Sequence, residues 1–449
     1  MGDNKILIIG AGLAGSDAAY FLASRQIPVV LMESKTITPT PAQKMKTAAE
    51  LVCTNSMKSL DPDSSHGLLK NEMTILGSLI LECANKHRVP AGGALAVNRE
   101  EFSKEVSSAL KSHAFIQFIE QVAEDPRLLM KEYGCNYCII ASGPLTLSVL
   151  ENWIKKEIGE EDFYFYDAIA PIVDADSLDT SKMYFKGRHV EDGEGADYLN
   201  VPLNEVEYKN FIAALKSAQK VPAKNFEEEK FFESCLPVDL MAERGEETAR
   251  FSCMKPIGLK QPGMKLHHAV VQLRKENLLG SAFNIVGFQT RLTYKEQLRV
   301  FRMLPGFQNA TFLHLGSVHR NSFINARAHL NFDMSLKHSP EIYFAGQMTG
   351  VEGYTESAAS GLYVAHCLVK KLKRFEVLPF PVTSAIGALI NYIMTSPTPR
   401  PSNINTGLFP EVEMTREELK SKMRKSFKKE LIAKRANRDL GQFLSAAEI

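Results

Sequence analysis

Absences narrow the classes of protein to which this sequence can belong. The 449 residues include no apolar run close to the roughly 20 residues that a membrane-spanning helix needs. The nearest candidate, SAIGALINYIM, is far too short. The 53 Lys and Arg residues almost balance the 52 Asp and Glu residues, so the net charge of +1 creates no general attraction to nucleic acid. Any RNA or DNA partner would have to be bound by local basic patches.

Cysteine is also scarce, with 7 residues at irregular spacing. The number is odd, and the first residues, MGDNKILIIGAG, do not form a secretory signal, which together indicate a reducing compartment. We therefore expect a cytoplasmic protein without a membrane anchor. Cys135 and Cys138 form a C-x-x-C pair, but the sequence has no second pair to complete a zinc site. Cys138 enters an apolar strand, so core packing is favoured and no metal site is expected.

What the sequence does contain is a nucleotide-binding motif near its start. The strand KILIIG runs into GAGLAG, a helical pattern follows, and the next strand, PVVLME, ends at Glu33. Gly10 permits the tight turn, Gly12 lets the backbone approach a pyrophosphate, and Gly15 lets helix and strand pack closely. The helix start offers free N–H groups to the phosphates. Glu33 suits a ribose diol, so a bound dinucleotide is favoured over a ligand-free glycine turn.

A second glycine turn favours FAD over NAD as that dinucleotide. In YFAGQMTGVEGYTESAASG the turn precedes a helix that can direct its positive end at the pyrimidine edge of a flavin. A second Rossmann fingerprint is missing, so NAD(P)H would visit the flavin only transiently. The strand CIIASGP ends in small residues, which suits a dinucleotide lying across it. The predicted cofactor-binding residues are Gly10, Ala11, Gly12, Leu13, Ala14, Gly15, Glu33, Gly346, Gln347, Gly350, Gly353 and Tyr354.

The order of the predicted elements indicates an α/β protein with an insertion. Residues 1–167 form the first part of a Rossmann-like FAD-binding domain. Residues 168–335 change to short strands with interrupting helices, which predicts an α+β domain around a mixed or antiparallel sheet that faces the substrate. Residues 336–449 return to the FAD-binding domain and end in a basic helix. This helix is predicted to be either a solvated surface helix or a helix that contacts RNA.

Two cysteines lie in polar, turn-like segments and are candidates for catalysis. They are Cys53 in AELVCTNSMKS and Cys235 in FFESCLPVDLMAERG. A thiolate is a strong nucleophile, and two such thiols near a flavin site indicate a catalytic role more strongly than a single thiol does. Cys83 and Cys367 fall in helical patterns and are predicted to be buried, whereas Cys253 is ambiguous.

Several segments together resemble the folate- and FAD-dependent tRNA uracil-5-methyltransferases. The match covers residues from about 5 to 410, and its most specific parts are AELVC, VPAGGALAV and GQMTGVEGYTESAASG. The family usually has a His-x-Thr-x-x-Phe run just before the first of these. Here that stretch is AQKMKTA, which lacks the histidine and the phenylalanine. A related branch methylates a uridine of large-subunit ribosomal RNA, so 23S ribosomal RNA is the alternative to the T loop of tRNA.

The resemblance implies a reaction that forms 5-methyluridine. NAD(P)H reduces the FAD, and the one-carbon unit comes from 5,10-methylenetetrahydrofolate. Uracil C5 is a poor nucleophile, so a thiolate adds to C6 to activate it, and a base removes the C5 proton. Cys53 and Cys235 fall where the family has its two functional cysteines, and we predict Cys235 as the nucleophile and Cys53 as the base. The target base must leave its stack to reach both thiols.

Two other classes of function fit parts of the sequence. A plain NAD(P)H-flavin oxidoreductase would need a cysteine close to Cys53 in sequence, and none exists. A non-catalytic RNA-binding flavoprotein would tolerate the loss of both thiols, yet both are present. For RNA binding, Lys295, Arg299 and Arg302 have the spacing of one helix face and form the predicted basic patch.

Overall fold

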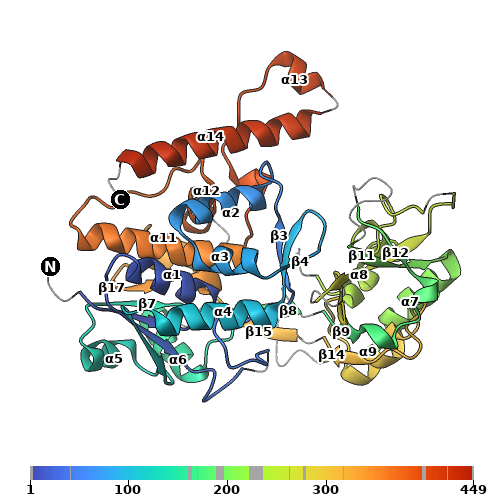
Figure 1. Cartoon of the computed structure of the whole chain (residues 1–449), viewed down its shortest axis with the longest axis horizontal. Coiled ribbons are helices and arrows are strands. Elements are labelled where there is room, and N and C mark those ends of the chain that lie inside the picture. Colours follow the sequence, from blue (N-terminus) through green and yellow to red (C-terminus); the bar gives the residue numbers. More distant parts are fainter. Residues whose placement is uncertain are drawn as a thin grey trace.

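The computed structural model describes residues 4–40, 42–159, 164–168, 170–188, 197–221, 236–261, 263–276, 280–316, 318–396, 401–421 and 423–446. These residues form two bodies that lie side by side (Figure 1). The larger body contains segments from both ends of the chain, and the smaller one is built from residues between them.

A six-stranded sheet forms the centre of the larger body. Its strand order is β16 (Ser335–Leu336), β17 (Ser339–Phe344), β7 (Tyr137–Ile140), β1 (Ile6–Ile9), β2 (Val29–Glu33) and β6 (Ile116–Glu120). Apart from β16 with β17, all neighbours pair in parallel. All four residues of β1 are buried, as a continuous apolar run predicts. The loops after β1, β2, β7 and β17 therefore meet at the carboxyl edge of the sheet, where ligands of such folds bind.

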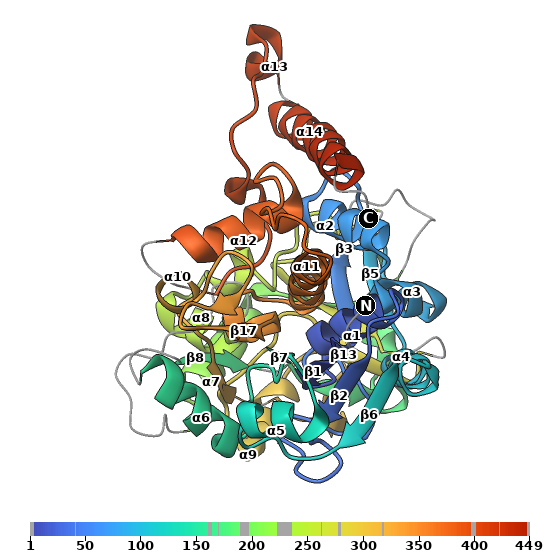
Figure 2. The same ribbon diagram turned by 90° about the vertical axis from the view of Figure 1, so that its left-hand side faces the viewer.

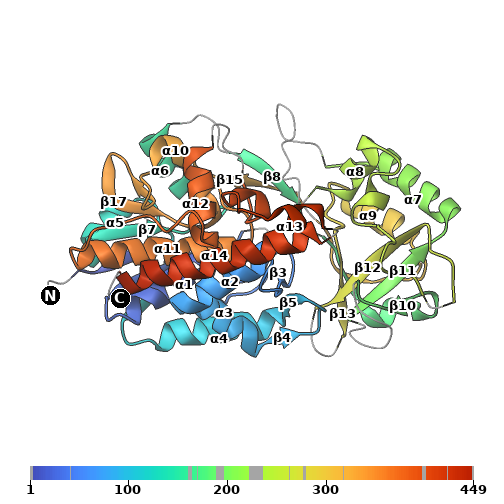
Figure 3. The same cartoon turned by 90° about the horizontal axis from the view of Figure 1, so that it is seen from above.

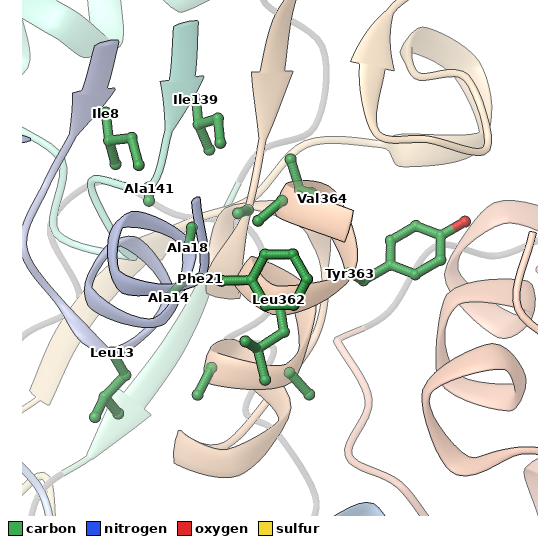
Figure 4. Packing of buried hydrophobic residues seen from close by; sticks show 14 of the residues in the cluster. Ile8, Leu13, Ala14, Ala18, Phe21, Ile139, Ala141, Leu362, Tyr363 and Val364 are labelled. Atoms are coloured by element: carbon green, nitrogen blue, oxygen red, sulfur yellow. The ribbon is translucent and has the colours of Figure 1, made fainter. Parts of the chain in front are cut away.

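Helix α1 (Leu13–Ala23) packs closely on helix α11 (Tyr354–Leu372), as Figure 4 shows. Small residues make this contact possible, because a Cβ atom on Gly361 would lie only 2.2 Å from the carbonyl oxygen of Ala14. Phe21 and Leu362 are both buried beside it. The contact holds the two glycine turns, which precede the two helices, against each other.

Further helices and a small sheet complete the larger body. The helices are α2 (Ser65–Leu76), α3 (Leu79–Lys86), α4 (Arg99–Ser112), α5 (Pro126–Tyr133), α6 (Ser148–Ile158), α10 (Ala326–His329) and α12 (Ala385–Thr395), and the small sheet contains β3 (Ser56–Ser59), β5 (Ala94–Val97) and β4 (Arg88–Val89). The chain breaks between α2 and α3 because Gly77 takes a φ of +83° and the Ser78 hydroxyl caps α3 by accepting the Leu81 N–H.

The smaller body is an antiparallel sheet with helices packed on it, as predicted for an α+β insertion. The strand order is β10 (Tyr184–Phe185), β11 (Tyr198–Leu203), β12 (Ala269–Lys275), β13 (Ala282–Ile285), β9 (Ile172–Asp174) and β14 (Phe312–His314). Helices α7 (Glu205–Ser217), α8 (Val238–Arg244) and α9 (Tyr294–Phe301) belong to this body, which has its own hydrophobic core.

Two antiparallel strands connect the bodies. β8 (Tyr164–Ala168) leads into the smaller body and pairs with β15 (Val318–Ser322), which leads back. After β15 the chain rejoins the larger body at once, since Ile324 and Leu330 are already part of its core. The return therefore precedes residue 335, at which the sequence pattern ended the insertion, because the residues between 324 and 335 pack on the first core.

The basic C-terminal segment forms α13 (Arg416–Lys420) and α14 (Arg424–Ala446), which project from one side of the larger body (Figure 2). Seen from above in Figure 3, α14 crosses over the larger body. Ile432, Ala436 and Leu440 bury one face of α14, so it is amphipathic rather than solvated all round. Within the described ranges we find no helix with the length and apolarity needed to cross a membrane.

Candidate active site

A cleft lies at the carboxyl edge of the six-stranded sheet, and we call it the dinucleotide cleft. The first glycine turn, the ends of β2 and β7, and the start of α11 line it. Among the predicted cofactor residues, those that line it are Gly10, Gly12, Leu13, Ala14, Glu33, Gly346, Gln347 and Tyr354. The other four, Ala11, Gly15, Gly350 and Gly353, lie in the turns and the first helix behind this surface.

The first glycine turn has the shape that a pyrophosphate site requires. Gly10 has a φ of +104°, and a Cβ atom on Gly15 would lie 1.9 Å from the Gly10 carbonyl oxygen, so both positions need glycine. A Cβ atom on Gly12 would instead meet nothing within 4 Å and would project into open space. The backbone at Gly12 is therefore open to a ligand, and the first turn of α1 directs its free N–H groups there.

The carboxylate of Glu33 is held at the tip of β2. Its Oε2 accepts the Ala11 N–H at 2.9 Å, and its Oε1 accepts the N–H groups of Ser34 and Lys35 at 2.8 and 2.9 Å. Oε2 can accept one further hydrogen bond, so the group can still bind a ribose hydroxyl. The residues of the cleft thus fit a dinucleotide, with the phosphates at α1 and a ribose at Glu33.

The second glycine turn closes the other side of the cleft. Gly346 opens a short 3-10 turn, Gly346–Thr349, and its N–H donates to the Ser360 hydroxyl at 2.6 Å. Gly350 and Gly353 have φ values of +90° and +113°, so the chain can reverse into α11. The positive end of α11 therefore faces the cleft at Tyr354, as expected for a site that holds a flavin.

Other lining residues were not among the predicted cofactor-binding residues. Gln43 and Gln121 reach the cleft from loops, and Ser142 and Gly143 follow β7. Ser142 and Gly143 could be predicted from the small residues at the end of β7. The sequence has no comparable pattern at Gln43 or Gln121.

Cys53 lies where this cleft meets a second hollow. Its side chain is half-buried, and its backbone N–H donates to the Tyr354 hydroxyl at 2.7 Å. The Thr54 N–H donates to the same oxygen at 3.0 Å. Burial raises the pKa of Tyr354, and the nearby Cys53 raises it further, so the phenol remains protonated. Tyr354 thus joins the start of α11 to the loop that carries the predicted catalytic thiol.

The second hollow, which we call the interdomain groove, runs between the two bodies. From the larger body it is lined mainly by Lys44, Met45, Leu51, Val52, Cys53, Asn98 and Arg99. From the smaller body it is lined mainly by Ile172, Glu276, Ala282, Tyr294, Phe312, Leu313 and His314. The groove and the dinucleotide cleft share Ala42, Glu50 and Val52, so a substrate in the groove would adjoin a cofactor in the cleft.

Buried hydrogen bonds tie the Cys53 loop to the smaller body. Arg274 of β12 donates from Nε to the Asn55 Oδ1 at 2.8 Å and from its guanidinium to the Thr54 hydroxyl. Asn55 in turn donates to the Lys275 carbonyl oxygen at 2.8 Å. Burial lowers the pKa of Arg274 from 12.5, yet a guanidinium stays charged at neutral pH. The position of the thiol loop therefore depends on both bodies.

A buried carboxylate supports the same region from behind. Glu356 follows Tyr354 in α11 and is fully buried, with Lys58 Nζ at 3.2 Å and His66 Nδ1 at 3.4 Å. Burial alone would raise the pKa of Glu356, but Lys58 and His66 outweigh this effect and hold it at about 2.

The remaining cysteines differ from Cys53. Cys83, Cys138 and Cys367 are buried, as predicted for packing residues, Cys135 is buried as well, and burial raises the pKa of each of these thiols. Burial also raises the pKa of Cys253 to about 12, and its sulfur contacts that of Met241 at 3.9 Å, which resolves the ambiguity in favour of packing.

The predicted nucleophile, Cys235, lies outside the described residues. The chain resumes at Leu236, whose side chain is buried in the core of the smaller body.

The predicted basic patch on α9 is only partly available to a ligand. Lys295 is exposed, and Arg299 is exposed but pairs with Glu296 at 2.5 Å. Arg302 lies just beyond the helix, and its guanidinium donates to the Ala310 carbonyl oxygen at 3.0 and 3.3 Å. Arg302 thus has two of its guanidinium donors bound to a neighbouring loop, which helical spacing does not show, and RNA binding by the patch stays a prediction.

The parallel sheet, the two glycine turns and the carboxylate of Glu33 define a Rossmann-like dinucleotide-binding protein with an inserted domain. The family model described as glucose inhibited division protein A matches residues 5–376. The chain belongs to this family, in the TrmFO branch that its relatives below represent.

The relatives match over nearly the whole chain. It is 47% identical over 446 residues to the methylenetetrahydrofolate--tRNA-(uracil-5-)-methyltransferase TrmFO of Geobacter sulfurreducens, covering 98% of this chain and 99% of that protein. The protein of the same name from Geotalea uraniireducens is 48% identical at the same coverage. The solved structure of Aquifex aeolicus GidA matches with a TM-score of 0.66 at 14% identity, covering 97% of this chain and 76% of that one. That likeness confirms the predicted fold class.

Proposed function

We propose that the chain is a methylenetetrahydrofolate-dependent tRNA (uracil-C5)-methyltransferase that uses FAD and NAD(P)H and forms 5-methyluridine in the T loop. The observation that carries the proposal is the position of Cys53 at the junction of the dinucleotide cleft and the interdomain groove. Identities of 47 and 48% to relatives named for this reaction support it. Both relatives are named for tRNA, so 23S ribosomal RNA is the less favoured substrate.

The residues that would hold the FAD are those of the two glycine turns. The N–H groups at the start of α1 would bind the pyrophosphate, Glu33 would bind a ribose, and the start of α11 would face the flavin ring. When bound and reduced, the flavin supplies the carrier for the one-carbon unit and the hydride that completes the methyl group. A cytoplasmic location forms part of the proposal, in keeping with the seven cysteines and the absence of a disulfide among the described ones.

The two thiols act on the adjacent C6 and C5 positions of the uracil ring in this proposal. The thiolate of Cys235 adds to C6, and the new S–C6 bond moves electron density to C5, which then forms the bond to the incoming carbon. Cys53 removes the C5 proton as a base, and the S–C6 bond breaks when the product leaves. The loop of Cys53 is held by Tyr354 and Arg274, which keeps its thiol at the mouth of the groove.

The activity is tested with the purified holoprotein. The protein should be yellow, and with NADPH and 5,10-methylenetetrahydrofolate it should form 5-methyluridine in unmodified tRNA, mapped by mass spectrometry. Unmodified 23S ribosomal RNA serves as the second substrate in a parallel reaction. If only the ribosomal RNA is methylated, ribosomal RNA replaces tRNA as the target. A flavin-loaded protein that methylates neither RNA would contradict the proposed reaction.

The roles of the thiols are tested with RNA that carries 5-fluorouracil at the target position. Fluorine blocks the removal of the proton from C5, so the covalent adduct at C6 should accumulate. Cys53→Ala should still form the adduct but make no product on normal RNA, whereas Cys235→Ala should form no adduct. The opposite pattern would exchange the two roles. Methylation by both variants at the parent rate would remove both thiols from the mechanism.

A further inference from the structure

Tyr294 is the first residue of α9 and is 61% exposed in the wall of the interdomain groove. Helical spacing alone would place it on the same face as Gln297 and Phe301, which are both fully buried. Side chains of a helix tilt toward its N-terminus, so the first residue projects beyond the helix end. Tyr294 therefore projects into the groove instead of packing beneath the helix.

The ring of Tyr294 has no structural task that explains its position. Within the described parts of the chain, no residue makes a hydrogen bond with its hydroxyl or packs a ring or cation against its face. A single exposed aromatic side chain is common on protein surfaces and needs no explanation by itself. Here, however, Leu313 in the same wall is 48% exposed and Phe312 is half-buried, and the groove also contains Cys53. The wall thus offers a planar and apolar surface to a ligand that must reach the thiol.

The charges along the groove suit a ligand with a phosphate backbone. Each carboxylate that lines it has a cationic partner, and the pairs are Glu50 with Lys35 at 3.2 Å, Glu276 with Arg99 at 2.8 Å, and Glu100 with Lys104 at 3.9 Å. Lys295, which is exposed beside Tyr294, can contact a phosphate. Burial lowers the pKa of His314, and Arg99 and Lys44 lower it further, so its imidazole is neutral at pH 7 and provides a second planar surface rather than a charge.

We propose that Tyr294 is the platform on which a nucleobase of the substrate RNA stacks in the interdomain groove. The proposal rests on the proposed function and adds a residue that binds the RNA. Unstacked bases of RNA loops are commonly bound on aromatic side chains of this kind. The folate also has planar rings, but it must reach the flavin, and Tyr294 lines the groove and not the dinucleotide cleft. The phosphate-compatible charges beside Tyr294 favour RNA.

The test compares Tyr294→Ala with Tyr294→Phe in the holoprotein. Dissociation constants are measured by fluorescence anisotropy with an unmodified T-arm stem-loop, and KM is measured for RNA and for 5,10-methylenetetrahydrofolate separately. Tyr294→Ala should weaken RNA binding roughly 5- to 150-fold, the range that base stacking on an aromatic residue provides. Tyr294→Phe should bind RNA like the parent, since stacking needs the ring and not the hydroxyl. Retained flavin and an unchanged melting temperature show that the variants are folded.

Phe375→Ala is the matched control. Phe375 is 43% exposed and follows the far end of α11, whose 19 residues span roughly 28 Å from the cleft. This variant should bind and methylate RNA like the parent. Unchanged RNA affinity in Tyr294→Ala would overturn the proposal, and so would a rise confined to the folate KM, which would assign the ring to folate. A parent protein that methylates no RNA refutes the proposed function instead, and the anisotropy comparison still tests the stacking.

Discussion

Replacing Lys58 by Met should destabilise the larger body because it removes the closest cation from a buried carboxylate. Glu356 is fully buried, and its pKa is held at about 2 instead of the usual 4.5. That difference corresponds to about 3 kcal/mol of stability at neutral pH. Lys58 is the stronger of its two partners but is itself one-third exposed. We therefore expect a loss of about 2 kcal/mol, below the full value for a buried pair.

The contribution of Glu356 to the free energy of unfolding depends on pH, and the pKa shift fixes the direction of this dependence. The pKa of Glu356 is lower in the folded than in the unfolded state, so the carboxylate stabilises the fold above about pH 5, and this stabilisation is lost as the pH falls toward about 2. Without Lys58, burial dominates and raises the pKa of Glu356. The difference in stability between Lys58→Met and the parent should therefore be largest at pH 7.5 and shrink near pH 4.

Urea unfolding followed by the fluorescence of Trp153 is a suitable assay. Trp153 is the only tryptophan of the chain, and it is buried in the core of the same body. Lys86→Met is the control, because Lys86 pairs with Glu82 and Glu105 at half-exposed positions, where a salt bridge contributes only about 0–1 kcal/mol. A variant at Lys58 that unfolds at the urea midpoint of the parent would refute the reasoning, as would a deficit that does not change with pH.

Three other substitutions test the cleft and the thiol loop. Gly12→Val should abolish flavin binding, because its side chain would fill the open space at the phosphate site; a yellow variant would contradict this. Tyr354→Phe leaves the N–H groups of Cys53 and Thr54 without their acceptor, which costs about 1–3 kcal/mol, and the freed loop should let iodoacetamide alkylate Cys53 faster than in the parent. Arg274→Met removes the hydrogen bonds that this residue of the smaller body donates to the loop and should likewise raise the rate at which Cys53 is alkylated. Equal rates in parent and variant would show that Arg274 does not fix the thiol.

The central sheet and the first glycine turn could be predicted because their signals are local. β1 is a continuous apolar run, Gly10 takes a positive φ in the turn that follows it, and Gly15 must be glycine because it lies against Gly10 within one β-α-β unit. Helix α5 also has local signals, since Asp125 caps it, Pro126 is its first residue and Gly134 ends it in the left-handed region.

The geometry around Cys53 could not be predicted, because its determinants are distant in sequence. The acceptor of the Cys53 N–H is 301 residues away, and Arg274 lies 219 residues from Asn55. Helical spacing was likewise insufficient for α9. It grouped Arg302 with Lys295, whereas the structure shows that Arg302 holds the loop at Ala310. Tertiary contacts decide which groups such a side chain binds, and the helical periodicity of a sequence does not reveal those contacts.

The loop of Cys53 is attached to both bodies, and this limits how RNA can enter the interdomain groove. Tyr354 holds the loop from the larger body, and Arg274 holds it from the smaller body through buried hydrogen bonds to Thr54 and Asn55. A wide separation of the bodies would break the hydrogen bonds of Arg274 and leave a buried charge without partners, which is costly. The groove is therefore expected to admit an extruded nucleotide without opening. The thiol, the aromatic wall and the mouth of the cofactor cleft then keep one fixed arrangement before the RNA binds.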